Sequence, residues 1–73
     1  MNLKQLEAFV EVAEKNSFSK AAKSLYLTQP TVSAHISALE KELGSRLLIR
    51  NTKEVELSES GKRLYEYANR SYF

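Results

Sequence analysis

Two amphipathic stretches separated by a very short break constrain the fold of this chain more than any other feature. The break is Leu27-Thr28-Gln29-Pro30, and it contains the only proline of the sequence. Proline disfavours helical geometry at the residue before it and is well tolerated in a helix's first turn. One helix therefore ends before the break and another begins within it, with Thr28 as the expected N-cap.

The helix before the break is expected over residues 18–26. Its apolar side chains recur at spacings of three and four, which places them on one face: Phe18, Ala21, Ala22 and Leu25. The two adjacent alanines let a second helix approach closely and cross at a steep angle.

The helix after the break carries a buried stripe at the same spacing, formed by Val32, Ile36, Leu39 and Leu43. Gly44 follows it, at the position where a helix commonly ends in a left-handed conformation. Two short helices joined by a three- or four-residue turn predict a helix-turn-helix.

The flanking segments predict two more helices and a hairpin. A first helix is expected to end near residue 15, with Asn2 and Gln5 forming a capping box and one apolar stripe: Leu3, Leu6, Phe9, Val10 and Ala13. Residues 47–50 and 54–57 predict a small β-hairpin, in which the second run alternates apolar and charged residues. Ser58 is the expected cap of a final helix that continues to the C-terminus.

The expected fold class is therefore mainly α, a winged helix-turn-helix over residues 1–57 followed by a linker helix over residues 58–73. With 73 residues the chain forms one domain at most, around a core that all helices share. The N-terminal segment mixes charges at short intervals and lacks the apolar run of a signal peptide or membrane span, so a cytosolic protein is expected.

Catalysis and cofactor binding are not expected of this composition. The chain has no cysteine, no aspartate and one histidine. A single histidine needs several carboxylate partners to hold a metal, and no nucleophile with a paired base or glycine-rich phosphate loop is recognisable. His35 flanks the buried stripe of the third helix and is interpreted as a packing residue.

The charges are unevenly distributed, although the net charge is only +2. Residues 15–39 contain no carboxylate but three lysines, and residues 43–53 contain no carboxylate but Arg46, Arg50 and Lys53. Two separate acid-free segments suit a polyanion on one face of the molecule.

The outer face of the third helix offers small and polar side chains where a solvated helix usually carries long charged ones. We expect six of its residues to read DNA bases: Gln29, Pro30, Thr31, Ser33, Ala34 and Ser37. Gln29 can form paired hydrogen bonds with adenine, the hydroxyls can donate or accept at any base, and Pro30 or Ala34 can pack on a thymine methyl. On the residues alone, an ordinary solvated face is an equally good interpretation.

Phosphate contacts are expected from two places. Ser19, Lys20 and Thr28 lie near helix N-termini, where free amides and the helix dipole favour an anion. Arg50 and Lys53 lie in the hairpin and can reach a phosphate or the minor groove. Equally, these two cations can simply keep a hairpin edge soluble.

The last helix presents an apolar and aromatic side that is expected to pair two chains, forming an antiparallel homodimer through Leu64, Tyr65, Ala68 and Tyr72. The alternative is that this side only covers its own domain.

The sequence also resembles a known family, the LysR-type bacterial transcriptional regulators. The resemblance covers residues 1–64 and rests on NLKQLEAFVEVAE, on SFSKAAKSLYLTQPTVSAHISALEKELGSRLLIR and on LSESGKRL. The pattern of AA, LxxTQP, VS, IxxLE and LGxxL is highly specific.

Membership would imply a winged helix-turn-helix, pairing along the linker helix, and base contacts by Gln29, Pro30, Thr31 and Ser33 with position 34 beside them. Many members carry arginine at the position of Ala34, so a guanidinium contact from that position cannot be transferred. Full-length members continue into a domain that binds a small-molecule effector, so this chain is expected to be a DNA-binding fragment. The alternative from another class is a helix-turn-helix module that binds protein instead of DNA.

Overall fold

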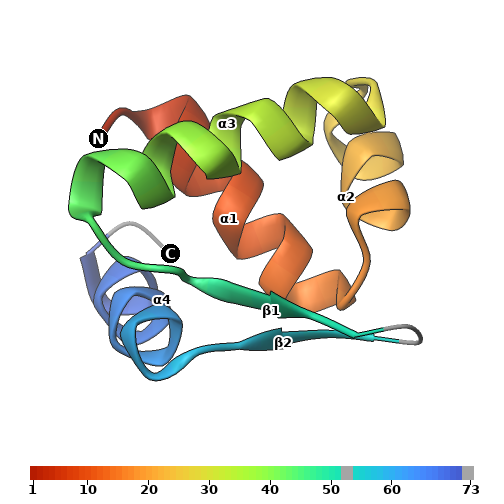
Figure 1. Cartoon of the computed structure of the whole chain (residues 1–73). Helices are drawn as coiled ribbons and strands as arrows, with labels where there is room; N and C mark the ends of the chain where they lie inside the picture. The colour runs from red at the N-terminus through yellow and green to blue at the C-terminus, as the bar shows by residue number, and fades with distance from the viewer. Residues whose placement is uncertain (52–53, 72–73) are drawn as a thin grey trace.

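The computed structural model describes residues 1–51 and 54–71 and confirms the expected winged helix-turn-helix architecture. The elements follow in the order α1 (Leu3–Lys15), α2 (Phe18–Leu25), α3 (Gln29–Leu43), β1 (Leu48–Arg50), β2 (Val55–Leu57) and α4 (Glu59–Ser71). Helices α1, α2 and α3 pack on one another, the hairpin runs along one side of them, and α4 lies at the end of the hairpin away from its turn (Figure 1).

Local capping explains where α1 and α2 begin. Asn2 accepts a hydrogen bond from the Gln5 amide at 2.9 Å, and the Gln5 side chain accepts one from the Asn2 amide at 3.2 Å, which completes the capping box. Asn16 ends α1 in the left-handed conformation, with φ of 53°. Ser17 then caps α2 by accepting from the Lys20 amide at 3.1 Å.

The turn between α2 and α3 is built from a left-handed residue and a cap. Helix α2 ends at Leu25, one residue earlier than expected, because Tyr26 adopts φ of 58°. The Leu27 amide donates to the Ala22 carbonyl at 2.9 Å, which satisfies the end of α2. Thr28 caps α3 as predicted, accepting from the Thr31 amide at 3.3 Å, and Gly44 ends α3 with φ of 66°.

One continuous core joins all the helices and the first strand. Its fully buried large side chains are Phe9, Val12, Val32, Ile36, Leu39 and Leu47. Leu3 and Leu43, which were expected on buried stripes, are 55% and 45% exposed, so that part of the prediction is wrong. Each lies in a terminal turn of its helix, and the core near the end of α3 is filled by Leu47 and Leu48 instead.

The hairpin is antiparallel, with Leu48 opposite Leu57 and Arg50 opposite Val55. Its first strand is tied to α3 through Glu40. One carboxylate oxygen of Glu40 accepts hydrogen bonds from the amides of Leu47, at 2.8 Å, and Leu48, at 3.2 Å. The position of the hairpin relative to α3 is therefore fixed by a charge-assisted contact. Lys53 lies outside the described residues.

Helix α4 packs its small and apolar side against its own domain. Ser58 caps it, accepting from the Gly61 amide at 3.0 Å and donating to the Arg46 carbonyl at 2.5 Å. Ala68 is fully buried in the domain core, and Leu64 and Tyr65 are half-buried against that core.

This packing corrects the expected dimer surface at Ala68, which has no exposed area left to offer a second chain. Spacings of three and four identify an apolar face but do not say which body covers it. Tyr72 lies outside the described residues. None of the helices within residues 1–51 and 54–71 is both long enough and apolar enough to span a membrane.

Candidate nucleic-acid interface

The outer face of α3 is available for contact along its first three turns. Gln29, Pro30, Ala34 and Ser37 are exposed and Ser33 is half-buried. Among the described residues, no hydrogen bond engages the side chain of Gln29 or Ser37. Of these five side chains expected to read bases, four are therefore exposed and Ser33 is partly exposed, and together they form a single ridge on α3.

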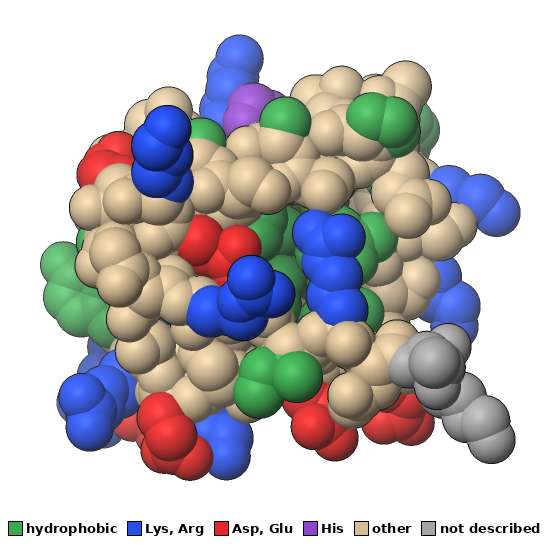
Figure 2. Space-filling model, viewed as in Figure 1, with side chains coloured by type: hydrophobic (Ala, Val, Ile, Leu, Met, Phe, Trp, Pro, Cys, Tyr) green, Lys and Arg blue, Asp and Glu red, His purple; other side chains and the backbone are tan. Residues whose placement is uncertain are grey.

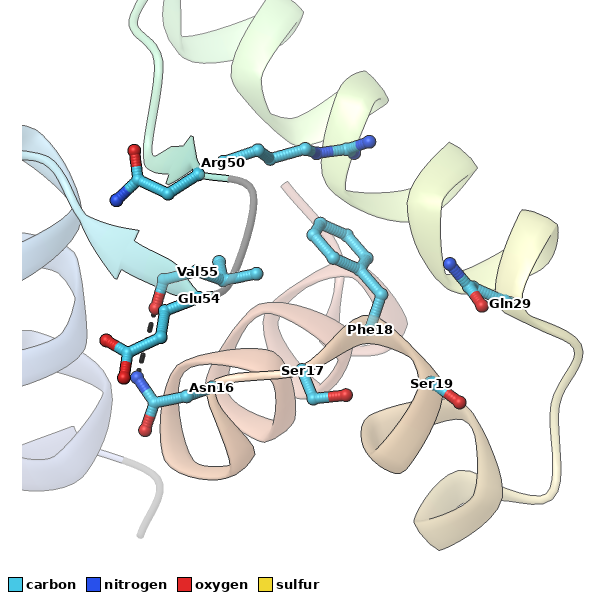
Figure 3. A pocket seen from close by; sticks show the side chains of 9 residues that line it. Asn16, Ser17, Phe18, Ser19, Gln29, Arg50, Glu54 and Val55 are labelled. Carbon is cyan, nitrogen blue, oxygen red and sulfur yellow. Dashed lines mark hydrogen bonds between the residues drawn. The ribbon is translucent and has the colours of Figure 1, made fainter.

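Arg50 reaches from the hairpin to this ridge. Its guanidinium carbon lies 4.1 Å from the centre of the Phe18 ring, and its Nη2 donates to the Ser33 hydroxyl at 3.1 Å. Figure 3 shows the side chain running from β1 across Phe18 toward α3. Arg50 thus belongs to the α3 side of the hairpin rather than to its turn.

Two open hollows flank Arg50 in the space between α3 and the hairpin. The first brings together residues from α2, α3 and β1, including Ser19, Gln29 and Arg50. The second is lined by Ser33, Ser37, Arg46 and Arg50 among others. We call the two hollows together the trench, and it lies on the face seen in Figure 2, where basic side chains stand in the middle.

Charged side chains of both signs line the trench, and its two arginines are the groups there that can meet an anion. Arg46 and Arg50 line it, whereas most acidic side chains in Figure 2 gather along the lower edge. Glu40 also lines the trench, and one oxygen of its carboxylate accepts hydrogen bonds from two backbone amides. Glu54 also lines the first hollow of the trench, and with Glu56 it borders a separate hollow beside α4 and the end of α1.

Five of the expected DNA-contacting residues that the structure describes do not line the trench. Pro30 and Ala34 are exposed on the ridge itself, and Thr28 is the exposed cap of α3. Thr31 is half-buried on another side of α3, where it lines a hollow with Lys4 and His35. Its hydroxyl lies 2.8 Å from that of Thr28, so the two threonines form a hydrogen bond with one another at the start of α3. Lys20 is exposed in the first turn of α2 but does not line the trench.

Two residues of the trench were missed as site residues. Phe18 was assigned to the core, and it is 7% exposed, but the same ring also supports Arg50. Arg46 was noticed only as a cation in an acid-free segment. That segment was the available signal, since both arginines of the trench come from residues 43–53.

No group of three or more metal-ligating side chains gathers anywhere in the part of the chain that the structure describes. His35 is half-buried in the hollow that Thr31 lines, which agrees with its interpretation as a packing residue.

Three packed helices with a two-stranded hairpin beside the third define a winged helix-turn-helix domain. The sequence pattern of bacterial regulatory helix-turn-helix proteins of the lysR family matches residues 3–62. The chain belongs to this family.

Two relatives of this chain are longer transcriptional regulators. It is 50% identical over 70 residues to an uncharacterized HTH-type transcriptional regulator of Azotobacter vinelandii, covering 96% of this chain and 49% of that protein. It is 40% identical over 70 residues to the HTH-type transcriptional regulator CitR of Bacillus subtilis, covering 96% and 24%. The chain thus spans about half of the first relative and about a quarter of the second.

Solved structures share the fold closely. The BenM_DBD complex with benA site 1 DNA has a TM-score of 0.91 and 43% identity, covering 96% of this chain and 79% of that chain. The CbnR_DBD–DNA complex has a TM-score of 0.91 and 38% identity, covering 96% and 80%.

Proposed function

We propose that this chain binds double-stranded DNA in a sequence-specific manner, as the DNA-binding part of a LysR-type transcriptional regulator. The observation that carries the proposal is the exposed ridge of small and polar side chains on α3, bordered by the two arginines of the trench. The two solved relatives named above are complexes with DNA, which supports the same function.

In this proposal α3 enters the major groove with its N-terminal half against the base edges. Gln29 is placed to pair with adenine through two hydrogen bonds, and Ser33 and Ser37 offer hydroxyls. Pro30 and Ala34 offer apolar surface to a thymine methyl. Because these side chains are small, the backbone of α3 can lie close to the groove floor. A base contact by Thr31 is proposed only because this residue lies in the first turn of α3.

The trench suits the sugar-phosphate strand that separates the major groove from the adjacent minor groove. Arg46 and Arg50 offer charge within it, and Ser19 borders it at the first turn of α2. Thr28 and Lys20 add a hydroxyl and a charge near helix N-termini, where phosphates bind readily. Lys53, in the hairpin turn, remains a sequence-based proposal for a phosphate or minor-groove contact.

The base-reading role of Gln29 is tested by comparing two DNAs. Gln29→Ala should weaken binding to a selected operator by about 1–3 kcal/mol, because a paired hydrogen bond to a base is lost. Binding to random duplex should change much less. The matched control is Lys20→Ala, which removes a charge and should weaken binding to both DNAs alike. Fluorescence anisotropy titrations at fixed salt measure both; equal losses for Gln29→Ala on the two DNAs contradict base reading.

We also propose that two chains pair along α4 so that two α3 helices face an imperfect palindrome. The half-buried Leu64 and Tyr65 retain some surface for a partner, Tyr72 is proposed from the sequence, and Ala68 is withdrawn because it is buried. Sedimentation velocity over a concentration series should show a dimer. A chain that stays a monomer at the concentrations that bind the operator contradicts the proposal.

The wider role follows from the family. We propose that effector binding belongs to parts of the full-length regulator outside these residues, that the domain itself catalyses no reaction, and that it acts in the cytoplasm, where a bacterial chromosome lies. If the chain retards neither operator nor random duplex at low salt, binding to another protein becomes the better interpretation.

A further inference from the structure

The Arg50 side chain is restrained at two points. Its guanidinium stacks on the face of the Phe18 ring, a cation–π contact at 4.1 Å, and its Nη2 donates to Ser33 across 17 positions of sequence. Phe18 is 7% exposed, so the ring that supports the guanidinium is itself held by the core. Arg50 therefore approaches Ser33 from a defined direction before any DNA is present.

This contact changes what the Ser33 hydroxyl can do. A hydroxyl has one proton to donate and two lone pairs that accept, whereas a guanidinium can only donate. Arg50 occupies a lone pair of Ser33, and a charged donor withdraws electron density from the oxygen. Donating its proton thereby becomes more favourable for this hydroxyl than accepting a second hydrogen bond. Among the described residues, no group accepts that proton.

We infer that Arg50 sets the hydrogen-bond polarity of Ser33, so that Ser33 reads an acceptor on a base edge, and that Phe18 is the residue that positions Arg50. This inference rests on the proposed function. In the major groove guanine offers N7 and O6, adenine N7 and thymine O4, whereas cytosine offers only its N4 donor. The base opposite Ser33 is therefore specified by exclusion of cytosine.

Site selection from random duplexes, followed by titration of single-base variants, tests the inference. The wild-type chain should disfavour cytosine at one position by about five-fold or more, the lower end of the discrimination that one base contact provides. Ser33→Ala identifies that position, because its discrimination is lost there. Arg50→Ala should relax the same position and leave the preferences at other positions unchanged.

Arg46→Ala is the matched control, since Arg46 contributes the same charge to the same hollow and makes no side-chain hydrogen bond among the described residues. It should weaken binding to all duplexes alike and preserve the base profile. A wild-type base profile in Arg50→Ala, with only a uniform loss of affinity like that of Arg46→Ala, overturns the inference. So does a Ser33→Ala profile that matches wild type.

Phe18→Leu tests the positioning role separately, because it keeps an apolar side chain and removes the ring face. A circular dichroism melt first confirms that the variant is folded at the assay temperature. Relaxed discrimination at the Ser33 position supports positioning by Phe18, and a wild-type profile in the folded variant contradicts it. Failure of the proposed function is distinguishable, since the wild-type chain would then enrich no site.

Discussion

Gly61 lies in the first turn of α4 at a place where even a methyl group does not fit. A Cβ built on Gly61 would lie 2.1 Å from the Leu47 carbonyl oxygen and 3.1 Å from the Leu47 carbonyl carbon. Ordinary carbon–oxygen contacts need about 3.3 Å or more, so Gly61→Ala forces α4 and the start of β1 apart by about 1 Å. The same carbonyl oxygen accepts a hydrogen bond from the Ser58 amide at 3.0 Å, and the substitution weakens this hydrogen bond as well.

The expected cost is the difference between two opposing effects. Overpacking of this kind costs about 1–3 kcal/mol, and weakening the Ser58 hydrogen bond adds about 1 kcal/mol. Against these, alanine is a better helix former than glycine by about 1 kcal/mol. The net loss of unfolding free energy is about 2 kcal/mol. In a domain of this size that lowers Tm by about 8–16 °C.

A thermal melt followed by circular dichroism measures the effect, with Gly44→Ala as the matched control. Gly44 has φ of +66° and no atom within 4 Å of a Cβ, so alanine there meets only the cost of the left-handed conformation, about 1 kcal/mol. Its Tm should fall by about 4–8 °C. A Gly61→Ala variant that melts at or above the wild-type temperature, or above Gly44→Ala, refutes the steric reasoning.

Two further predictions concern single anchoring contacts. Glu40→Ala leaves the amides of Leu47 and Leu48 without their acceptor, so urea unfolding should show a loss of about 1–3 kcal/mol with faster hydrogen exchange at those amides. Glu42→Ala removes a carboxylate of the same helix whose exposed ion pair joins it to the Met1 amino group, and it should change stability by less than about 1 kcal/mol. Equal losses in the two variants would contradict the anchoring role. Asn2→Ala removes the capping box of α1 and should cost about 1 kcal/mol, whereas Asn2→Ser should restore most of it; a melt in which both variants match wild type would count against the cap.

Features with a local cause were predictable from the sequence. The caps at Asn2, Thr28 and Gly44 were expected at their observed positions, because each depends on residues within one turn. The hairpin followed from alternation and turn residues in the same way.

Features that depend on packing between distant segments were not predictable. The period of α4 revealed its apolar side but not that Ala68 would be enclosed by its own domain. The contact between Arg50 and Ser33 joins a strand to a helix, and no local pattern marks it. The contact between Phe18 and Arg50 was not predictable either. The helical spacing of Phe18 indicates that it is buried, but not that a guanidinium stacks on its ring.

The tie between Glu40 and the first strand has a consequence for how a duplex would have to fit. One side chain of α3 holds two consecutive amides of the segment that leads into the hairpin. The distance between α3 and the hairpin is therefore fixed before DNA binds. A duplex that binds tightly must have grooves and a backbone whose dimensions fit this fixed distance. DNA sequences differ in the free energy needed to bend their base-pair steps or to change their groove width. They should therefore differ in affinity for this domain, even at base pairs that no side chain contacts.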